Sequence, residues 1–167
     1  ANTVYVNGGD DIPEYHTDAV ILLKGEAVCE GYARLCDLLY REAGIESYFL
    51  AGRDHAWNIV KAGGHYFHAD ATWDDGAKIS HRYLMRSDSE FRADGGSHAV
   101  WTQLNPSSLH TAEDVLPKCL YCQGDVNTDG AVSAADLVKM SRVLMGMDTA
   151  EKDDIVLYDL DLSGGND

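Results

Sequence analysis

The feature that most constrains this chain is a stretch of twelve residues, 125–136, in which oxygen-bearing side chains recur at alternate positions. They stand at positions 1, 3, 5, 9 and 12 of the stretch, with a glycine at position 6: Asp125, Asn127, Asp129, Ser133, Asp136 and Gly130. An EF-hand-type loop has this spacing, because alternate residues turn oxygens towards a calcium ion and the glycine permits a sharp turn. Position 7, Ala131, offers its backbone carbonyl. An acidic surface turn is the alternative, but it would not require the glycine, so we predict a calcium-binding loop.

A helix and the start of a second loop follow the first loop. Apolar residues recur at helical spacing over residues 137–144, and Gly146 is typical of a helix end. Asp159, Asp161 and Ser163 then occupy positions 1, 3 and 5 of the same pattern, 34 residues after the first loop begins. We therefore predict that these three residues begin a second calcium loop, and that the region is a tandem repeat whose second copy is incomplete.

This arrangement is similar to a type I dockerin, the calcium-binding module by which secreted enzymes of polysaccharide-degrading cellulosomes dock onto cohesin modules of a scaffoldin. The resemblance rests on DVNTDGAVSAADLVKM and DLDLSGG, within residues 124–167. It implies an extracellular location, and Asp136 stands where the usual EF-hand has a glutamate at position 12. The calcium ligands of the first loop that it implies are Asp125, Asn127, Asp129, Ala131 and Asp136. The cohesin contacts that it implies are Ala134, Ala135, Leu137, Val138, Ser141 and Arg142.

The distribution of charge supports a division of the chain. Residues 1–123 hold 18 acidic and 10 basic residues, whereas the much shorter segment 124–167 holds 10 acidic and 3 basic ones. The formal net charge of −15 argues against binding to a phosphate backbone, which needs clustered cations. Since no apolar run approaches about 20 residues, we also expect no membrane span. We predict a domain over residues 1–116, a linker over 117–123 and the calcium-binding segment over 124–167.

A cysteine begins the clearest helical pattern of the first domain. Residues 25–44 keep one apolar face, and Gly44 is a natural C-terminal stop, so we predict a helix over this range with Cys29 near its start. Free backbone N–H groups and the partial positive charge of a helix N-terminus favour a thiolate. A cysteine in this position is more often a buried core residue than a nucleophile. Assigning Cys29 as a nucleophile therefore requires a general base and an orienting carboxylate close to it.

Strand patterns follow this helix and supply those partners. Residues 45–52, 55–60 and 65–73 are rich in aromatic and β-branched residues, and a Gly-Gly turn separates the second run from the third. If residues 55–60 and 65–70 form a hairpin, His55 near the start of one strand lies beside Asp70 near the end of the other. Cys29, His55 and Asp70 would then converge as nucleophile, general base and orienting carboxylate.

The same three segments resemble the transglutaminase-like superfamily of papain-like thiol enzymes. The resemblance rests on GEAVCEGYARL, GRDHAWNIV and HYFHADATWDD in this order, and on the later RYLMRSDSEFRADGGSHAVW. It implies an α+β fold in which a helix bearing Cys29 packs on an antiparallel sheet, joined here to a small α-helical, EF-hand-like dockerin segment. It assigns the nucleophile, base and carboxylate to Cys29, His55 and Asp70, and the backbone N–H of Cys29 is a candidate oxyanion donor. We expect no helix ahead of Cys29.

Other readings of the histidines and cysteines remain open. His65, His68 and Asp70 are close in sequence, but on a strand residue 65 points away from the other two, which disfavours a zinc site. Cys36 lies about 10.5 Å along the helix from Cys29, too far for a disulfide, so Cys29 is expected to be free. Cys119 and Cys122 form a lone CxxC, either a local disulfide or two thiols. His98 has no assigned role.

These patterns lead to two alternative functions. The first is a secreted thiol enzyme that acts on peptide or glutaminyl amide bonds of a peptide or protein substrate and is anchored by calcium-dependent binding to cohesin. The second is a non-catalytic module of the same fold that binds a peptide or a cell-wall component and is docked in the same way. Hydrolysis and transfer to a second amine are both compatible with the first.

Overall fold

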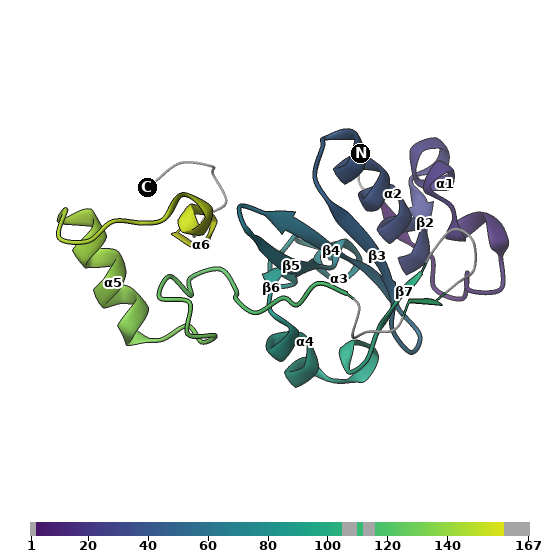
Figure 1. Cartoon of the computed structure of the whole chain (residues 1–167). Helices are drawn as coiled ribbons and strands as arrows, with labels where there is room; N and C mark the ends of the chain where they lie inside the picture. The colour runs from purple at the N-terminus through teal and green to yellow at the C-terminus, as the bar shows by residue number, and fades with distance from the viewer. Residues whose placement is uncertain (1–2, 105–109, 112–115, 159–167) are drawn as a thin grey trace.

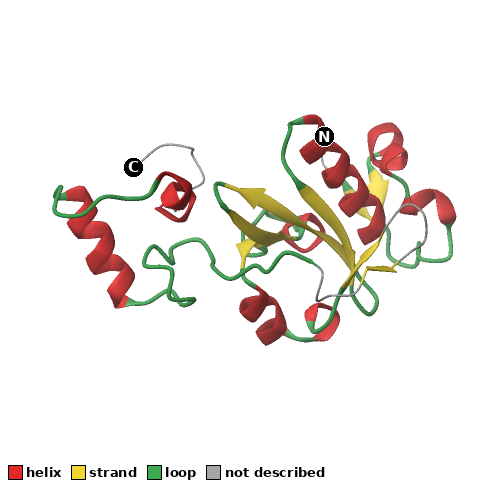
Figure 2. Cartoon of the chain, viewed as in Figure 1, coloured by secondary structure: helices red, strands yellow, loops and turns green. Residues whose placement is uncertain are grey.

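An antiparallel sheet lies at the centre of the protein and helices pack on it, so the chain has an α+β fold (Figures 1 and 2). The computed structural model describes residues 3–104, 110–111 and 116–158. Within these ranges the main sheet has the order β6-β5-β4-β3-β7-β8. Its strands are β3 (Ser47–Ala51), β4 (Ala56–Ala62), β5 (His65–Ala69), β6 (Leu84–Arg86), β7 (Thr102–Leu104) and β8 (His110–Thr111).

The predicted hairpin forms from β4 and β5. Ala62 pairs with His65 across a two-residue turn, and Gly63 adopts a φ of 57° there, which glycine tolerates without a steric penalty. The prediction of a strand over residues 65–73 is wrong at its end, because β5 stops at Ala69. Asp70 instead caps the short helix α3 (Ala71–Asp74), its side chain accepting hydrogen bonds from the backbone N–H groups of Thr72 and Trp73.

Helix α2 (Cys29–Glu42) packs against β3 and β4 and carries the predicted cysteine at its first residue. It begins four residues later than expected, because Gly25 has a φ of 71° and ends an earlier helix, α1 (Asp18–Lys24). The expectation that no helix precedes Cys29 is therefore wrong. Between the two helices lies β2 (Glu26–Ala27), which pairs in parallel with the N-terminal strand β1 (Val4–Tyr5). The short helix η1 (Pro13–His16) lies between β1 and α1 in the chain.

A second layer of aromatic side chains covers the sheet around α4 (Asp88–Asp94) and η2 (Gly96–His98). The buried core there consists of Leu50, Trp57, Ile59, Phe91, Trp101, Leu116 and Cys119. Cys119 belongs to the segment predicted as a linker, and it is 1% exposed. Cys119 and Cys122 are both free thiols, as are Cys29 and Cys36, so the local disulfide considered for the CxxC pair is absent from this structure.

The C-terminal segment contains α5 (Ala134–Leu144), η4 (Lys152–Asp154) and α6 (Ile155–Tyr158), and it contacts the hairpin (Figure 1). Val126 and Leu157, both fully buried, share a core with Phe67 of β5. His65 Nε2 lies 2.7 Å from Asp154 Oδ1. The predicted helix after the first loop is confirmed by α5. In the described part of the chain, no helix is both long enough and apolar enough to cross a membrane.

Candidate active site

The structure brings together the three residues that the sequence motifs single out as nucleophile, base and carboxylate. Cys29 is the first residue of α2, whose N-cap residue Val28 makes no side-chain capping bond, so the helix start is not closed by a cap. His55 lies just before β4, where the neighbouring Ala56 packs against Cys29, and the Cys29 side chain acts to raise the pKa of His55. His55 Nε2 lies 2.6 Å from Asp70 Oδ2. The order thiol, imidazole, carboxylate is the arrangement that activates a cysteine for attack on a carbonyl.

The three side chains are nearly enclosed, with exposed fractions of 8% for Cys29, 8% for His55 and 1% for Asp70. Burial alone would lower the pKa of His55, but the hydrogen bonds with Asp70 and Cys29 and the attraction of their charges outweigh it and raise this pKa to about 9. Burial acts to raise the pKa of Asp70, but hydrogen bonds from His55 and His98 lower it overall. The imidazolium form of His55 facing an ionised Asp70 is therefore favoured at neutral pH.

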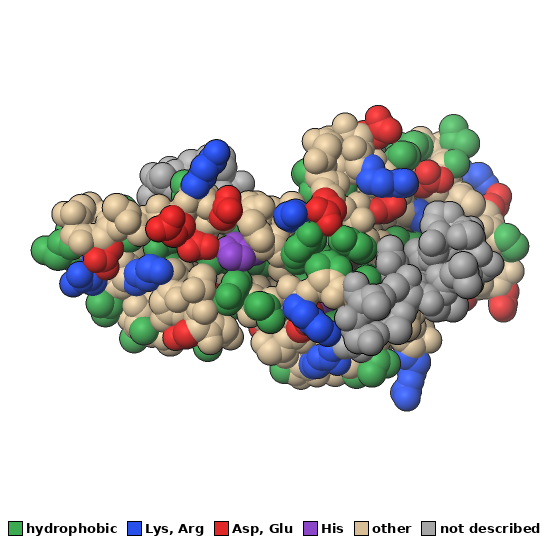
Figure 3. Space-filling view, in the orientation of Figure 1, with side chains coloured by type: hydrophobic (Ala, Val, Ile, Leu, Met, Phe, Trp, Pro, Cys, Tyr) green, Lys and Arg blue, Asp and Glu red, His purple; other side chains and the backbone are tan. Residues whose placement is uncertain are grey.

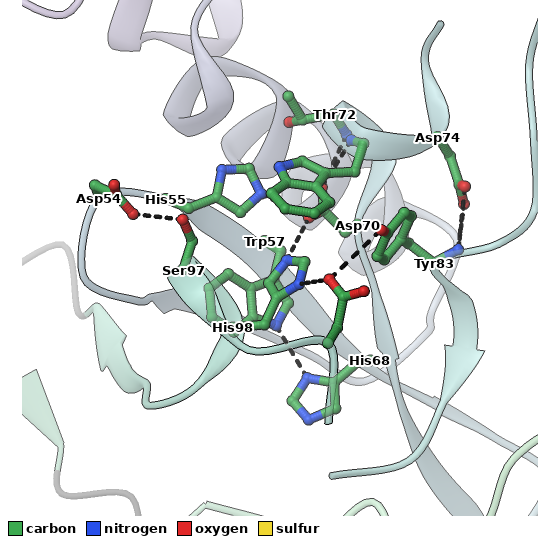
Figure 4. Close-up of polar contacts among 12 residues, drawn as sticks. Asp54, His55, Trp57, His68, Asp70, Thr72, Asp74, Tyr83, Ser97 and His98 are labelled. Carbon is green, nitrogen blue, oxygen red and sulfur yellow. Dashed lines mark hydrogen bonds and ion pairs between the residues drawn. The ribbon is translucent and has the colours of Figure 1, made fainter. Parts of the chain in front are cut away.

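A second histidine, which the sequence left without a role, shares the carboxylate with His55. His98 Nε2 lies 3.0 Å from Asp70 Oδ2, the same oxygen that His55 contacts (Figure 4). The other oxygen, Oδ1, accepts the two backbone N–H groups at the start of α3. Both oxygens of Asp70 are thus engaged by two donors each. The one sequence signal that could have found His98 is its place in the family-like segment that ends at Trp101.

Tyr5 lies beside Cys29. The β1–β2 pairing brings Tyr5 to the cluster that contains Cys29, and its ring packs against that cluster. Burial, followed by the nearby charges of Cys29, Asp10 and Asp54, raises the pKa of Tyr5. Because the backbone N–H of Cys29 is the candidate oxyanion donor, the Tyr5 phenol belongs to the surroundings of that donor. No sequence pattern pointed to this residue.

Two tryptophans flank the imidazole of His55. Trp57 stacks on it with ring centroids 5.7 Å apart and is 1% exposed, so it supports the ring from the core. Trp73 lies 5.6 Å from the same ring but is 43% exposed, which makes it the aromatic side chain available to a substrate. A pocket of about 840 Å³ is lined by Asp70 and by residues of α2 and α3, and Cys29 and His55 do not line it. It is therefore separate from the Cys29 thiol.

The zinc alternative is not supported by the contacts of the three residues it involves. His65 contacts Asp154, His68 contacts Asp88, and Asp70 contacts His55 and His98. Among the described residues, the groups that could hold a metal are His55, Asp70 and His98, and His68, Asp88 and Cys119. In the second group, His68 Nδ1 accepts the indole N–H of Trp57, so Nε2 carries the proton given to Asp88 and has no lone pair for a metal.

The predicted first calcium loop has the turn geometry of its motif. Gly130 adopts a φ of 91°, and its N–H donates to Asp125 Oδ2 at 2.9 Å. Asp136 Oδ1 accepts the N–H of Asn127, and Ser133 caps α5 in a reciprocal capping box with Asp136. Asp125 and Asp136 are 0% and 2% exposed. Burial first, and then the charges of Asp136 and Asp129, raise the pKa of Asp125, a repulsion that a bound cation would relieve.

The three loop carboxylates do not converge as closely as the two clusters above, since Asp125, Asp129 and Asp136 are absent from the groups with ligand atoms within 4.8 Å in the part of the chain described. The predicted ligands of the second loop, Asp159, Asp161 and Ser163, lie outside the described residues. The six positions predicted to contact cohesin are all exposed: Ala134, Ala135, Leu137, Val138, Ser141 and Arg142. Arg142 is paired with Asp148 through its Nε at 2.7 Å.

No protein-family model matches this chain, and a search of curated proteins finds no match to it.

Proposed function

We propose that residues 1–116 form a transglutaminase-like thiol enzyme that acts on peptide or glutaminyl amide bonds. The observation that carries the proposal is that Cys29, buried at a helix start, packs beside the buried His55–Asp70 pair. The order of the three residues matches the resemblance found in the sequence, in which the same residues serve as nucleophile, base and carboxylate. A buried polar network that only stabilised the fold would not require a free thiol beside the His55–Asp70 pair.

The reaction follows from the relay of Cys29, His55 and Asp70. The Cys29 thiolate attacks the substrate carbonyl, and the oxyanion that forms is stabilised by the backbone N–H of Cys29. The His55 imidazolium donates its proton to the leaving ammonia or amine, which leaves a thioester on Cys29 and a neutral imidazole. Water or a second amine then attacks the thioester while His55 accepts its proton, the thiolate leaves, and the thiolate and imidazolium of the starting state are restored. Asp70 keeps the imidazole oriented throughout.

Selective alkylation tests the activated thiol without a substrate. We expect iodoacetamide at pH 7 to modify Cys29 before the other three cysteines, because burial raises the pKa of Cys36 to about 11, that of Cys122 to about 12, and that of Cys119 further still. Peptide mass spectrometry of a time course measures the four rates in one sample. Labelling of Cys29 no faster than Cys36 would contradict the proposal and favour the alternative of a non-catalytic binding module.

We also propose that the Tyr5 hydroxyl acts as a second oxyanion donor. Tyr5 packs beside Cys29, so its O–H can donate to a substrate carbonyl oxygen that accepts the Cys29 N–H. Tyr5→Phe should therefore lower kcat by about 100-fold with little change in KM. Tyr48→Phe, a tyrosine whose hydroxyl contacts Glu46 instead, is the control. An increase in kcat for Tyr5→Phe would show that the phenol obstructs the site.

For the C-terminal segment we propose calcium-dependent docking to a cohesin, and with it an extracellular location. The turn geometry of residues 125–136 supports the ion, and the exposed apolar side chains of α5 support the partner. Leu137 and Val138 are 64% and 60% exposed, and hydrophobic side chains are visible at the α5 end of the molecule (Figure 3). When bound, calcium would neutralise the loop carboxylates and fix the start of α5.

A further inference from the structure

His98 is held in a single orientation beside the proposed catalytic residues. It is fully buried, and its ring packs between Trp73 at 4.5 Å, Phe91 at 4.4 Å and Trp57 at 5.0 Å between centroids. Its Nε2 contacts Asp70 Oδ2 at 3.0 Å, while the centroids of the His98 and His55 rings are 5.5 Å apart. The ring therefore reaches the carboxylate that His55 also contacts, and the packing leaves it little freedom to turn.

The second nitrogen of His98 extends the network away from the thiol. His98 Nδ1 lies 3.3 Å from Asp94 Oδ2, and the Tyr83 hydroxyl donates to the same oxygen at 3.5 Å (Figure 4). Arg82 Nη2 lies 3.7 Å from the other oxygen of Asp94, whose side chain is 24% exposed. Among the described residues, the charged and titratable groups around His98 include Asp70, His55, Asp94, Tyr83 and His68, with Arg82 behind Asp94. Both ring nitrogens face a carboxylate oxygen.

We propose that His98 is a positioning residue that fixes the Asp70 carboxylate, so that Oδ2 meets His55 Nε2 in the orientation needed for proton transfer. Four donors share the two oxygens of Asp70, and His98 supplies the one that comes from outside both the hairpin and α3. Without His98, Oδ2 would be held by the His55 imidazole, and that imidazole is the group that Asp70 has to orient. This inference rests on the proposed function of Cys29, His55 and Asp70.

Three variants test the role. His98→Leu removes both contacts, and we expect kcat to fall about 10- to 100-fold with KM little changed. The alkaline limb of the pH profile should move down by about one pH unit, because a less well held carboxylate stabilises the His55 imidazolium less. His98→Gln, whose amide can donate to Asp70, should recover most of both losses. Asp94→Asn should shift the alkaline limb in the same direction but by less. Because the Asp94 side chain is partly exposed, this variant disturbs the packing less than a change of the buried His98 ring does.

A matched variant separates positioning from packing. His68 is also fully buried and stacks on Phe91 at 4.3 Å, but its Nε2 contacts Asp88 rather than Asp70. His68→Leu should lower the melting temperature as His98→Leu does and leave the pH profile in place. The inference would be overturned if the pH profiles of activity of wild type, His98→Leu and Asp94→Asn were the same. If His98→Leu does not fold, an unchanged limb in Asp94→Asn alone overturns it.

The rate of Cys29 alkylation against pH provides a readout that needs no substrate. A shift of that profile in His98→Leu, in a protein that turns over no amide, would support positioning and refute the proposed enzyme. Turnover by the wild type with identical alkylation profiles in wild type, His98→Leu and Asp94→Asn would support the enzyme and refute positioning. The two proposals can therefore fail separately.

Discussion

Cys29→Ala should abolish turnover of amide substrates, with kcat falling by about 10⁴-fold or more, because no other group in the relay can form the thioester. The measurement is ammonia or amine release from a library of peptide and glutaminyl donors, with wild type and variant compared at equal concentration. Cys36→Ala is the matched control, since it removes a thiol from the same helix at a half-buried position whose pKa burial raises to about 11. It should retain full activity.

The pH dependence of the wild type follows from the same geometry. His55 must be protonated to give a proton to the leaving amine, and its pKa is raised to about 9. Activity should therefore persist through neutral pH and fall as the pH rises through about 9, where the imidazolium is lost. The raised pKa also means that the ion pair with Asp70 stabilises the folded state below the unfolded value near 6.5, and that this contribution is lost on the way to pH 9.

Two results would contradict the assignment of the enzyme. One is equal turnover by wild type and Cys29→Ala, which would place any activity elsewhere in the molecule. The other is the lack of turnover on every donor together with unselective alkylation of Cys29. The second result would favour the non-catalytic binding module, in which the relay persists as a buried network and Trp73, 43% exposed, contacts a bound peptide.

Sequence reasoning succeeded where a property is local. The hairpin follows from alternation and a Gly-Gly turn, and its register brings His55 and Asp70 together. It failed where one residue has two possible uses. Periodicity predicts that Gly25 belongs to the helix that bears Cys29, whereas Gly25 ends α1. Alternation predicts that Asp70 is a strand residue, whereas it caps α3. Both errors concern the ends of elements, which hydrogen bonds decide rather than periodicity.

The residues that were missed depend on contacts over long stretches of chain. His98 is 28 residues from Asp70, in a short 3₁₀ turn without periodicity, so only tertiary packing brings it to the carboxylate. Tyr5 reaches Cys29 through the pairing of two short strands, β1 and β2, that no pattern signals. Cys119 lies in a stretch whose proline and glycine residues are typical of a linker, but its side chain packs in the main core. Composition alone does not reveal such burial.

Asp125→Ala should lower the affinity of the chain for calcium by about 100-fold or more, because it removes both the first ligand and the acceptor that shapes the loop. Its two oxygens accept the N–H groups of Asp129 and Gly130, so the variant loses the turn as well as a negative charge. Isothermal titration of calcium into the full chain measures the effect. Glu151→Gln, which removes a negative charge from an exposed position outside the loop, is the control and should bind as the wild type does.

The same titration distinguishes a calcium loop from an acidic turn. In a calcium loop, ion binding should also raise the melting temperature of the wild type, since Val126, the residue after Asp125, is buried against Phe67 and Leu157. Asp125→Ala should lose this stabilisation together with the affinity. Calcium affinity that is the same in wild type, Asp125→Ala and Glu151→Gln would mean that the buried carboxylates are held by their backbone hydrogen bonds alone. Docking to cohesin would then need a surface that does not depend on the ion.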